Sequence, residues 1–281
     1  MSLARKIKAL AAETGFGKVE TVLISEAPNE EMRGRCAIIS GGTGGIGFAI
    51  ARRFLLSGCS VVILGRDLDR GLAAEKELMS LDPHGDVLFV KCDVSEPKDL
   101  ENLFPTLNRE LPNFKVDILV NSAGVNRDSR FPYIEPDVIN QVLSVNLVGL
   151  LQLSQHVALR MIDLGVRGNI LNVGSVSGFR PASGVYEVSK WAVRGLTIGM
   201  ADELTKYGIV VNSIAPGPTA TAMTGRDGDS DLSLPWNPSG RMADPREIAH
   251  LATMLVSESG RLIVGDTLCA SGGAGVVSLH R

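Results

Sequence analysis

The chain has 281 residues, of which 44% are hydrophobic and 21% charged, and its formal net charge is −3. This length suits one α/β domain with a large buried core, and the weakly acidic charge gives no electrostatic argument for nucleic-acid binding. No apolar stretch stands out as long enough to span a bilayer. The four cysteines and four histidines are scattered singly, which predicts no metal site. Cys36, Cys59 and Cys92 lie in or beside apolar runs, which predicts buried thiols and a reducing (cytoplasmic) compartment.

The first segment of the chain is a predicted N-terminal extension, residues 1–33, ahead of a catalytic domain over residues 34–281. Residues 3–11 carry an apolar stripe with basic neighbours, which fits a short amphipathic helix, a weak targeting signal or a packing arm. Residues 19–25 are a candidate additional strand. We favour a structural or oligomer-contacting role for the extension.

After the extension, apolar runs alternate with helical patterns. The runs predict strands at Cys36–Ser40, Ser60–Leu64, Val87–Lys91, Val116–Asn121, Asn169–Val173, Ile209–Ile214 and Thr267–Ala270. The helical patterns fall at 45–57, 68–80, 97–110, 136–163, 184–207 and 245–258. This alternation predicts the α/β class: a single Rossmann-type, doubly wound parallel sheet with helices on both faces and ligands at the carboxyl ends of its strands.

A glycine-rich turn, Ser40–Gly47, connects the first predicted strand to the first helix. Its glycines at 41, 45 and 47 are spaced Gly-x-x-x-Gly-x-Gly, which differs from the commoner Gly-x-Gly-x-x-Gly pattern. Such a turn lets the backbone approach a phosphate closely and directs free N–H groups at the anion, and the helix dipole adds to the attraction. The strand–turn–helix context predicts a dinucleotide site.

Tyr186 and Lys190 stand four residues apart in a helical pattern and therefore share one face of the helix. Taken alone, this spacing more often marks a solvated surface pair. A phenol beside an ammonium is also a general acid and base, because the positive charge lowers the pKa of the phenol toward neutrality. The glycine-rich turn upstream favours this catalytic interpretation.

These motifs occur together with Asn121–Gly124, Ser175, and Pro216–Gly217 followed by Thr221. In this order they resemble the short-chain dehydrogenases/reductases over nearly the whole chain. The resemblance implies hydride transfer between a nicotinamide cofactor and a carbonyl or alcohol. It implies cofactor contacts from Gly41, Thr43, Gly45, Ile46, Gly47, Asp93, Val94, Asn121, Ala123, Gly124, Tyr186, Lys190, Pro216, Gly217, Thr219 and Thr221.

The resemblance also implies four catalytic residues. Tyr186 would be the general acid in reduction and the general base in oxidation, and Lys190 would lower its pKa and hold the nicotinamide ribose. Ser175 would donate a hydrogen bond to the substrate oxygen, and Asn146 would support a water chain that carries protons to solvent. The loop from Ser175 to Tyr186 is shorter than in most relatives, so Ser177 is the alternative hydroxyl.

The end of the second predicted strand bears on the choice of cofactor. Relatives that use NAD commonly have an acidic residue where this chain has Gly65. Gly65 removes a carboxylate that would repel a 2′-phosphate, and the neighbouring Arg66 can pair with that phosphate through its planar guanidinium. A basic residue common in the glycine turn of NADP-dependent relatives is replaced by Gly44. The sequence favours NADP(H), with NAD(H) as the alternative.

The substrate is predicted least sharply. Gly124–Asp128 resembles a segment of 3-oxoacyl-carrier-protein reductases, which predicts a reductase of a keto compound or 3-oxoacyl thioester. Asp202 and Glu203 stand where such a reductase commonly has an arginine, and they would repel an acidic carrier protein. Three arginines are candidates to compensate: Arg127, Arg130 and Arg160. A small-molecule carbonyl compound is at least as well favoured, and residues 223–241 are a candidate lid over it.

Two other functions remain open. One is an NAD-dependent sugar, polyol or hydroxy-acid dehydrogenase. The other is a non-catalytic protein that senses the cofactor, although such a protein would be expected to have lost part of the catalytic set. The resemblance also implies a homo-oligomer, a dimer or tetramer, formed through the long helices that hold Asn146 and Tyr186.

Overall fold

A single sheet of seven parallel strands forms the centre of the computed structural model, in the order β3-β2-β1-β4-β5-β6-β7. The structure describes residues 29–277 except 82–84, 113, 128 and 227–230. The strands are β1 (Cys36–Ser40), β2 (Ser60–Gly65), β3 (Val87–Lys91), β4 (Ile118–Asn121), β5 (Asn169–Val173), β6 (Val210–Pro216) and β7 (Thr267–Ala270). The order reverses between β1 and β4, as in dinucleotide-binding sheets, and confirms the predicted fold class.

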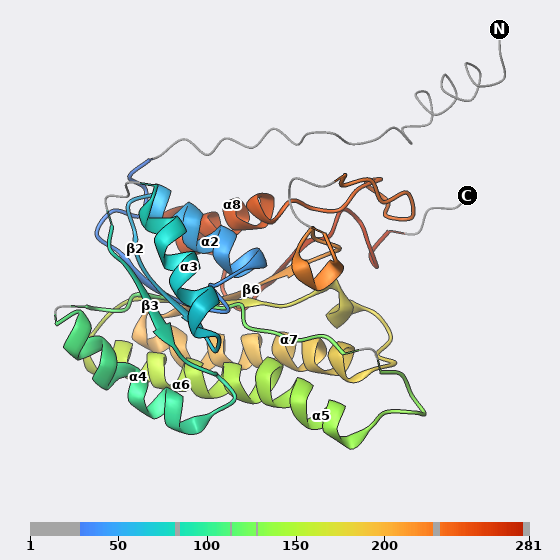
Figure 1. Cartoon of the computed structure of the whole chain (residues 1–281), viewed down its shortest axis with the longest axis horizontal. Helices are drawn as coiled ribbons and strands as arrows, with labels where there is room; N and C mark the ends of the chain where they lie inside the picture. Colours follow the sequence, from blue (N-terminus) through green and yellow to red (C-terminus); the bar gives the residue numbers. More distant parts are fainter. Residues whose placement is uncertain (1–28, 82–84, 113, 128, 227–230, 278–281) are drawn as a thin grey trace, which may run out of the picture.

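Helices cover both faces of this sheet, and Figure 1 shows α2, α3 and α8 on one side and α4, α5, α6 and α7 on the other. The helices are α2 (Gly45–Leu56), α3 (Leu68–Met79), α4 (Pro97–Glu110), α5 (Pro136–Leu143), α6 (Leu150–Asp163), α7 (Val185–Leu204) and α8 (Pro245–Val256). Short 3-10 turns extend several of the connections, at Val176–Phe179, Thr205–Tyr207, Ala222–Thr224 and Glu258–Gly260.

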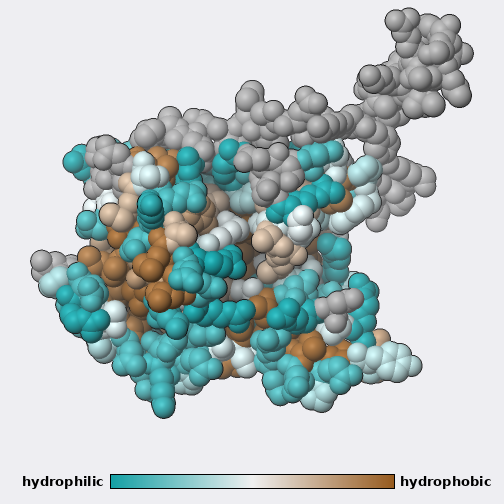
Figure 2. All heavy atoms as spheres, in the orientation of Figure 1, coloured by the Kyte–Doolittle hydropathy of each residue, from teal (hydrophilic) through white to brown (hydrophobic). Residues whose placement is uncertain are grey.

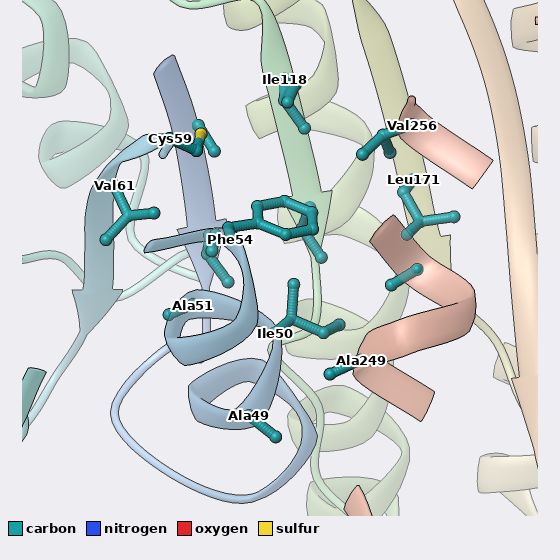
Figure 3. Packing of buried hydrophobic residues seen from close by; sticks show 14 of the residues in the cluster. Ala49, Ile50, Ala51, Phe54, Cys59, Val61, Ile118, Leu171, Ala249 and Val256 are labelled. Atoms are coloured by element: carbon teal, nitrogen blue, oxygen red, sulfur yellow. The ribbon is translucent and has the colours of Figure 1, made fainter. Parts of the chain in front are cut away.

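Two buried apolar clusters hold the layers together, one on each face of the sheet. On the first face, Phe54 and Ile50 of α2 are fully buried between the strands and Ala249 of α8 (Figure 3). The strands are buried on both sides, as β2 shows with four consecutive buried residues, because helices cover both faces. Truncating Phe54 to alanine would open a cavity at a cost of about 3–5 kcal/mol.

Helix boundaries follow the capping residues in the sequence. Asp67 caps α3 by accepting a hydrogen bond from the backbone N–H of Arg70. Asp244 and Glu247 form a capping box at the start of α8, with Pro245 at its first position. These caps satisfy N–H groups that have no partner inside the helix.

One strand is shorter than its apolar pattern predicts. The sequence predicts a strand from Val116, whereas β4 begins at Ile118. The Asp117 carboxylate accepts a hydrogen bond from the backbone N–H of Cys36 at 2.7 Å and pairs with the Arg35 guanidinium. A side chain therefore takes the place of a ladder hydrogen bond at this end of the sheet.

The predicted helix at 136–163 is interrupted by one turn of π-helix, Ser144–Gly149, between α5 and α6. By length and composition this helical run could cross a membrane, contrary to the sequence expectation, yet 44% of its most apolar window is buried. Leu153, Val157 and Met161 of α6 belong to the second apolar cluster, on the sheet. Packing on the sheet accounts for much of its apolar character.

The chain docks on the sheet layer before residue 34. Met32 is fully buried in the first apolar cluster, and its backbone N–H donates to Ser57 O at 2.8 Å. The predictions for residues 3–11 and 19–25 lie outside the described residues, and the division at residue 33 stays a prediction.

The surface in Figure 2 is largely hydrophilic, with hydrophobic residues gathered where α3 and β3 lie. Leu68, Leu72 and Met79 of α3 are about half exposed there. The strand β3 is at the edge of the sheet, so α3 has little beside it to cover its outer side.

Candidate active site

A pocket of ≈ 650 Å³ opens at the carboxyl ends of the strands, within the size range of small-molecule sites. It is lined by the segments that follow β1, β4, β5 and β6 and by the first turns of α2 and α7. The structure brings these predicted residues to its wall: Gly41, Thr43, Gly45, Ile46, Gly47, Ala123, Gly124, Ser175, Tyr186, Lys190, Pro216, Gly217, Thr219 and Thr221. Segments far apart in the sequence therefore meet at one site.

The glycine-rich turn is a close fit between β1, β4 and α2. Gly41 has φ +65, and a Cβ there would lie 2.8 Å from the backbone of Ala123. A Cβ at Gly47 would lie 2.3 Å from the carbonyl oxygen of Gly41. Only glycine lets α2 begin this close to the turn, and the first residues of α2, Gly45 and Ile46, line the pocket, where a helix N-terminus attracts an anion. The residues present thus fit a cofactor pyrophosphate.

Side chains at the ends of β1, β4 and β5 lock this edge of the sheet. The Ser40 hydroxyl accepts hydrogen bonds from the backbone N–H groups of Ser122 and Ala123, both at 3.2 Å. The Asn121 amide donates to Ser154 Oγ at 2.8 Å and to Asn172 Oδ1 at 2.9 Å. Asn121 is therefore buried in a network that fixes the strands, and a cofactor contact from it stays a prediction.

Tyr186 and Lys190 lie on successive turns at the start of α7. Lys190 is buried; its Nζ donates to Val173 O at 2.9 Å and lies 5.6 Å from the centroid of the Tyr186 ring. Burial lowers the pKa of Lys190 to about 8, because the ammonium loses its hydration. The pair is therefore set into the pocket wall rather than solvated.

Ser175 and Tyr186 both line the pocket, and the Ser175 side chain is near enough to lower the pKa of the Tyr186 phenol, so the predicted serine and tyrosine lie together. Burial raises the pKa of Tyr186, the hydrogen bond from Ser175 lowers it in part, and the charge of Glu187 raises it further. The net direction is upward, opposite to the lowering by Lys190 that the sequence suggested, because desolvation of the phenolate dominates. Ser177 also lines the pocket, and its backbone N–H donates to Ser175 Oγ at 3.1 Å.

Asn146 lies in the π-helical turn behind the pocket wall. Its Oδ1 accepts from the Val125 N–H at 2.8 Å, and its Nδ2 donates to Val125 O at 2.9 Å and Ser189 Oγ at 3.2 Å. A Cβ built on Gly124 would lie 3.5 Å from Asn146 Oδ1 and 3.9 Å from Lys190 Nζ, so both atoms border the same small space. π-helical turns are frequent at functional sites.

The structure keeps some predicted cofactor residues off the pocket wall: Arg66, Asp93, Val94 and Asn121. Arg66 is exposed at the end of β2. The Asp93 carboxylate accepts from the backbone N–H and hydroxyl of Ser95 at 3.0 and 2.6 Å. Val94 is buried in the second apolar cluster. Contacts of these residues with a cofactor stay predictions.

Two arginines line the pocket that sequence reasoning missed, Arg70 and Arg180. Arg70 is in the first turn of α3, and a Cβ built on Gly44 would lie 3.2 Å from its Nη2. Arg180 follows the 3-10 turn after Ser175. Arg180 could have been found from the sequence, since it stands in the loop between Ser175 and Tyr186 that relatives use to line the substrate pocket, but nothing in the local pattern singles out Arg70.

The far wall comes from the segment predicted as a lid. Four residues of that segment, Met223, Thr224, Leu234 and Trp236, line the pocket, as does Met242 just after it, while 227–230 lie outside the described residues. In the described part of the chain, no group of three or more His, Cys, Asp or Glu could hold a metal ion.

Three features together define a nicotinamide-dependent oxidoreductase of the Rossmann type. They are the strand order of the parallel sheet, the glycine-rich turn against a helix N-terminus, and the adjoining Ser–Tyr–Lys set. The chain belongs to the short-chain dehydrogenase family, because its residues 35–231 match the sequence model of that family. It is an oxidoreductase acting between an alcohol and a carbonyl with a nicotinamide cofactor, which confirms the resemblance found in the sequence.

Known relatives match nearly end to end. The chain is 34% identical over 246 residues to the 3-oxoacyl-[acyl-carrier-protein] reductase FabG of Vibrio harveyi. The aligned residues cover 86% of this chain and 98% of that protein. Its structure is similar to that of a 3-oxoacyl-[acyl-carrier protein] reductase from Brucella melitensis (TM-score 0.81, 27% identity, 93% of this chain and 100% of the other). It is also similar to a gluconate 5-dehydrogenase from Burkholderia cenocepacia in complex with NADP and tartrate (TM-score 0.79, 30% identity, 89% and 99%).

Proposed function

We propose that the chain is an NADPH-dependent reductase that converts a keto compound, or the keto group of a 3-oxoacyl thioester, into a secondary alcohol. The observation that carries this proposal is the meeting of Ser175, Tyr186 and buried Lys190 on the wall of one pocket, which also contains the glycine turn. Reductases of 3-oxoacyl groups among the relatives support the substrate class.

Each catalytic side chain has a distinct task in this reduction. When bound, a reduced nicotinamide would supply the hydride, with its two electrons, that the carbonyl carbon accepts. Ser175 donates a hydrogen bond to the carbonyl oxygen, and Tyr186 transfers its phenolic proton to that oxygen as the charge develops. The raised pKa of Tyr186 keeps the phenol protonated at neutral pH, so this group starts as a proton donor.

Lys190 and Asn146 support the proton donor, Tyr186. The ammonium of Lys190 stabilises the phenolate that forms on Tyr186, because a positive charge favours the charged form of a neighbouring acid. Asn146 hydrogen-bonds to the backbone of Val125 and to the Ser189 hydroxyl, and these bonds fix the segments next to Lys190. The small space bordered by Asn146 and Lys190 supports a water-mediated proton path to solvent.

The preference for NADP(H) is supported by charge near the glycine turn. A Cβ at Gly65 would lie 2.6 Å from Thr43 Cγ2, so a carboxylate that rejects the 2′-phosphate is poorly accommodated there. The Arg70 guanidinium lies over Gly44, the position where relatives often carry a basic residue. We therefore assign 2′-phosphate contacts to Arg70 as well as Arg66; NAD(H) is the alternative.

The acceptor is better supported as a small molecule than as a carrier protein. Asp202 and Glu203 are exposed on α7, where they would repel an acidic partner. The outer side of α6 and α7 also exposes large apolar side chains, which supports a dimer or tetramer through these helices; these residues are Leu151, Leu159, Val188, Trp191 and Ile198. The free cysteines support a reducing, cytoplasmic location.

Replacing Tyr186 with phenylalanine tests the enzyme proposal. The variant keeps the ring but loses the transferable proton, so kcat should fall by about 10²–10⁴. NADPH binding, followed by nicotinamide fluorescence, should change little. Unchanged turnover would contradict the assigned role, and a protein that binds NADPH but reduces no carbonyl even as wild type would favour the cofactor-sensing alternative.

A matched arginine pair tests the cofactor assignment. Arg70→Gln should weaken NADPH binding while leaving NADH binding nearly unchanged, because only the former has a 2′-phosphate to pair with. Arg109→Gln, on the exposed face of α4, is the control. Tighter binding of NADH than NADPH by the wild-type protein would show that the assignment is wrong.

A further inference from the structure

The charged side chains on the pocket wall all have the same sign. Among the described lining residues are three cations, Arg70, Arg180 and Lys190, and no Asp or Glu. Arg70 lies at the glycine-turn end and Lys190 beside the reacting tyrosine. Arg70 is assigned to the cofactor phosphate and Lys190 to proton transfer, so Arg180 is the cation of these three that has no assigned role. A cleft lined by one sign of charge concentrates ligands of the opposite sign.

The position of Arg180 is fixed at both its main chain and its aliphatic stem. Its carbonyl oxygen accepts a hydrogen bond from Trp191 Nε1 at 2.7 Å. A Cβ built on Gly275 would lie 2.4 Å from Arg180 Nε and 3.0 Å from its Cγ and Cδ, so the stem packs directly against this turn. The preceding Phe179 ring lies 4.1 Å from the Arg194 guanidinium carbon. A side chain held in this way loses less rotamer freedom when it binds a ligand.

The guanidinium of Arg180 has no protein acceptor within the described residues. Its Nε is buried and makes no hydrogen bond. Arg180 nevertheless lines the pocket, so the donors of its guanidinium are not taken up by protein acceptors there and can serve an anionic ligand. Guanidinium groups bind carboxylates through two parallel hydrogen bonds, which fixes the orientation as well as the charge of the ligand.

Arg180 belongs to the same short segment as the catalytic groups. It stands between Ser175 and Tyr186, which must both reach the substrate carbonyl oxygen. Building on the proposed reductase function, we propose that the substrate is an oxo acid whose carboxylate is bound by Arg180, and that the product is the corresponding hydroxy acid. The carboxylate would orient the carbonyl toward Ser175 and Tyr186, which makes Arg180 a specificity-determining residue.

Matched pairs of acid and ester test this inference directly. The probes are 2-oxobutyrate, acetoacetate and levulinate, each compared with its methyl ester, with NADPH as reductant. For at least one pair, kcat/KM should be about 10- to 100-fold higher for the acid, the range expected for hydrogen bonds to a charged group. This comparison uses the wild-type protein and does not depend on any variant folding.

Variants then assign the effect to one side chain. Arg180→Met should lower kcat/KM for the acid to the level of the ester, while Arg180→Lys should keep part of the preference because it retains charge without the planar fork. NADPH affinity, measured by fluorescence, should be unchanged in both. Arg109→Met on α4 is the control for loss of an exposed arginine.

The outcomes separate this inference from the proposed function. Equal use of acids and esters by the wild-type protein would overturn the inference and leave the reductase proposal standing. Equal losses for acid and ester in Arg180→Met, together with weaker NADPH binding, would show that Arg180 serves the cofactor and would also overturn it. Binding of NADPH without reduction of any probe would contradict both.

Discussion

Replacing Lys190 with methionine should make the protein more stable while removing its activity. The fall in the pKa of Lys190 from 10.5 to about 8 means that its protonation costs about 3 kcal/mol more in the folded than in the unfolded chain. Methionine fills similar space without a charge, but Val173 O loses its partner at 2.9 Å, which costs about 1 kcal/mol. At pH 7 the variant should therefore gain about 2 kcal/mol.

The pH dependence distinguishes this cause from better packing. Below about pH 8 the lysine is charged in both states, and the full cost is present. Between about 8 and 10.5 the folded chain releases the proton first, so the wild-type protein becomes more stable relative to the variant as pH rises. By pH 10 only about 1 kcal/mol of the cost remains, so the two proteins should be nearly equal.

Urea unfolding of both proteins at pH 7 and pH 10, without nucleotide and at matched concentration, measures the difference. Lys76→Met on the exposed face of α3 is the control and should show no such pH dependence. A variant less stable than wild type at pH 7, or a difference that stays constant between the two pH values, would refute the reasoning that burial of charge sets the pKa of Lys190.

Three further results follow from the same contacts. Gly47→Ala should lose about 1–3 kcal/mol of stability and bind NADPH more weakly, because its Cβ would meet Gly41 O at 2.3 Å. Gly195→Ala in α7, where a Cβ meets nothing within 4 Å, should instead gain up to about 1 kcal/mol of stability. Equal effects of the two substitutions on stability would contradict the geometry. Asn146→Leu should lose about 3 kcal/mol in urea unfolding, since it leaves the N–H and C=O of Val125 unpaired and removes the hydrogen bond that Ser189 Oγ accepts. A change below about 0.5 kcal/mol would mean that water replaces the amide. The reduction rate should fall as pH rises through about 8, where Lys190 loses its charge, and a rate that increases across this range would argue against a supporting cation.

The fold was predictable because several independent signals agree. Buried parallel strands read as continuous apolar runs, so four of the seven strands have the predicted bounds. Helix ends were predicted to within a few residues where capping residues such as Asp67 and Asp244 stand. The start of β4 was missed because Asp117 replaces a backbone partner with its own carboxylate, and such a contact has no periodic signature.

The site was predictable where chemistry depends on residue type and order, and less so where it depends on three-dimensional placement. Tyr186, Lys190, Ser175 and the glycine turn meet in one pocket as the sequence suggests. The direction of the pKa of Tyr186 was missed, because burial outweighs a nearby charge and burial cannot be counted from spacing. Arg70 was missed because only the packing of α3 against the glycine turn brings it to Gly44.

The π-helical turn at Ser144–Gly149 has a consequence for how this helical run can change. A π turn holds one residue more than the α-helical turn that it replaces, so α5 and α6 are out of phase by about 100° relative to one continuous α-helix. Each half can therefore keep its own apolar stripe on its neighbours while the turn directs the Asn146 amide to Val125 and Ser189. Deleting one residue within 144–149 would restore a regular helix and rotate one half against its packing. Along this run the chain should tolerate substitutions far better than changes in length.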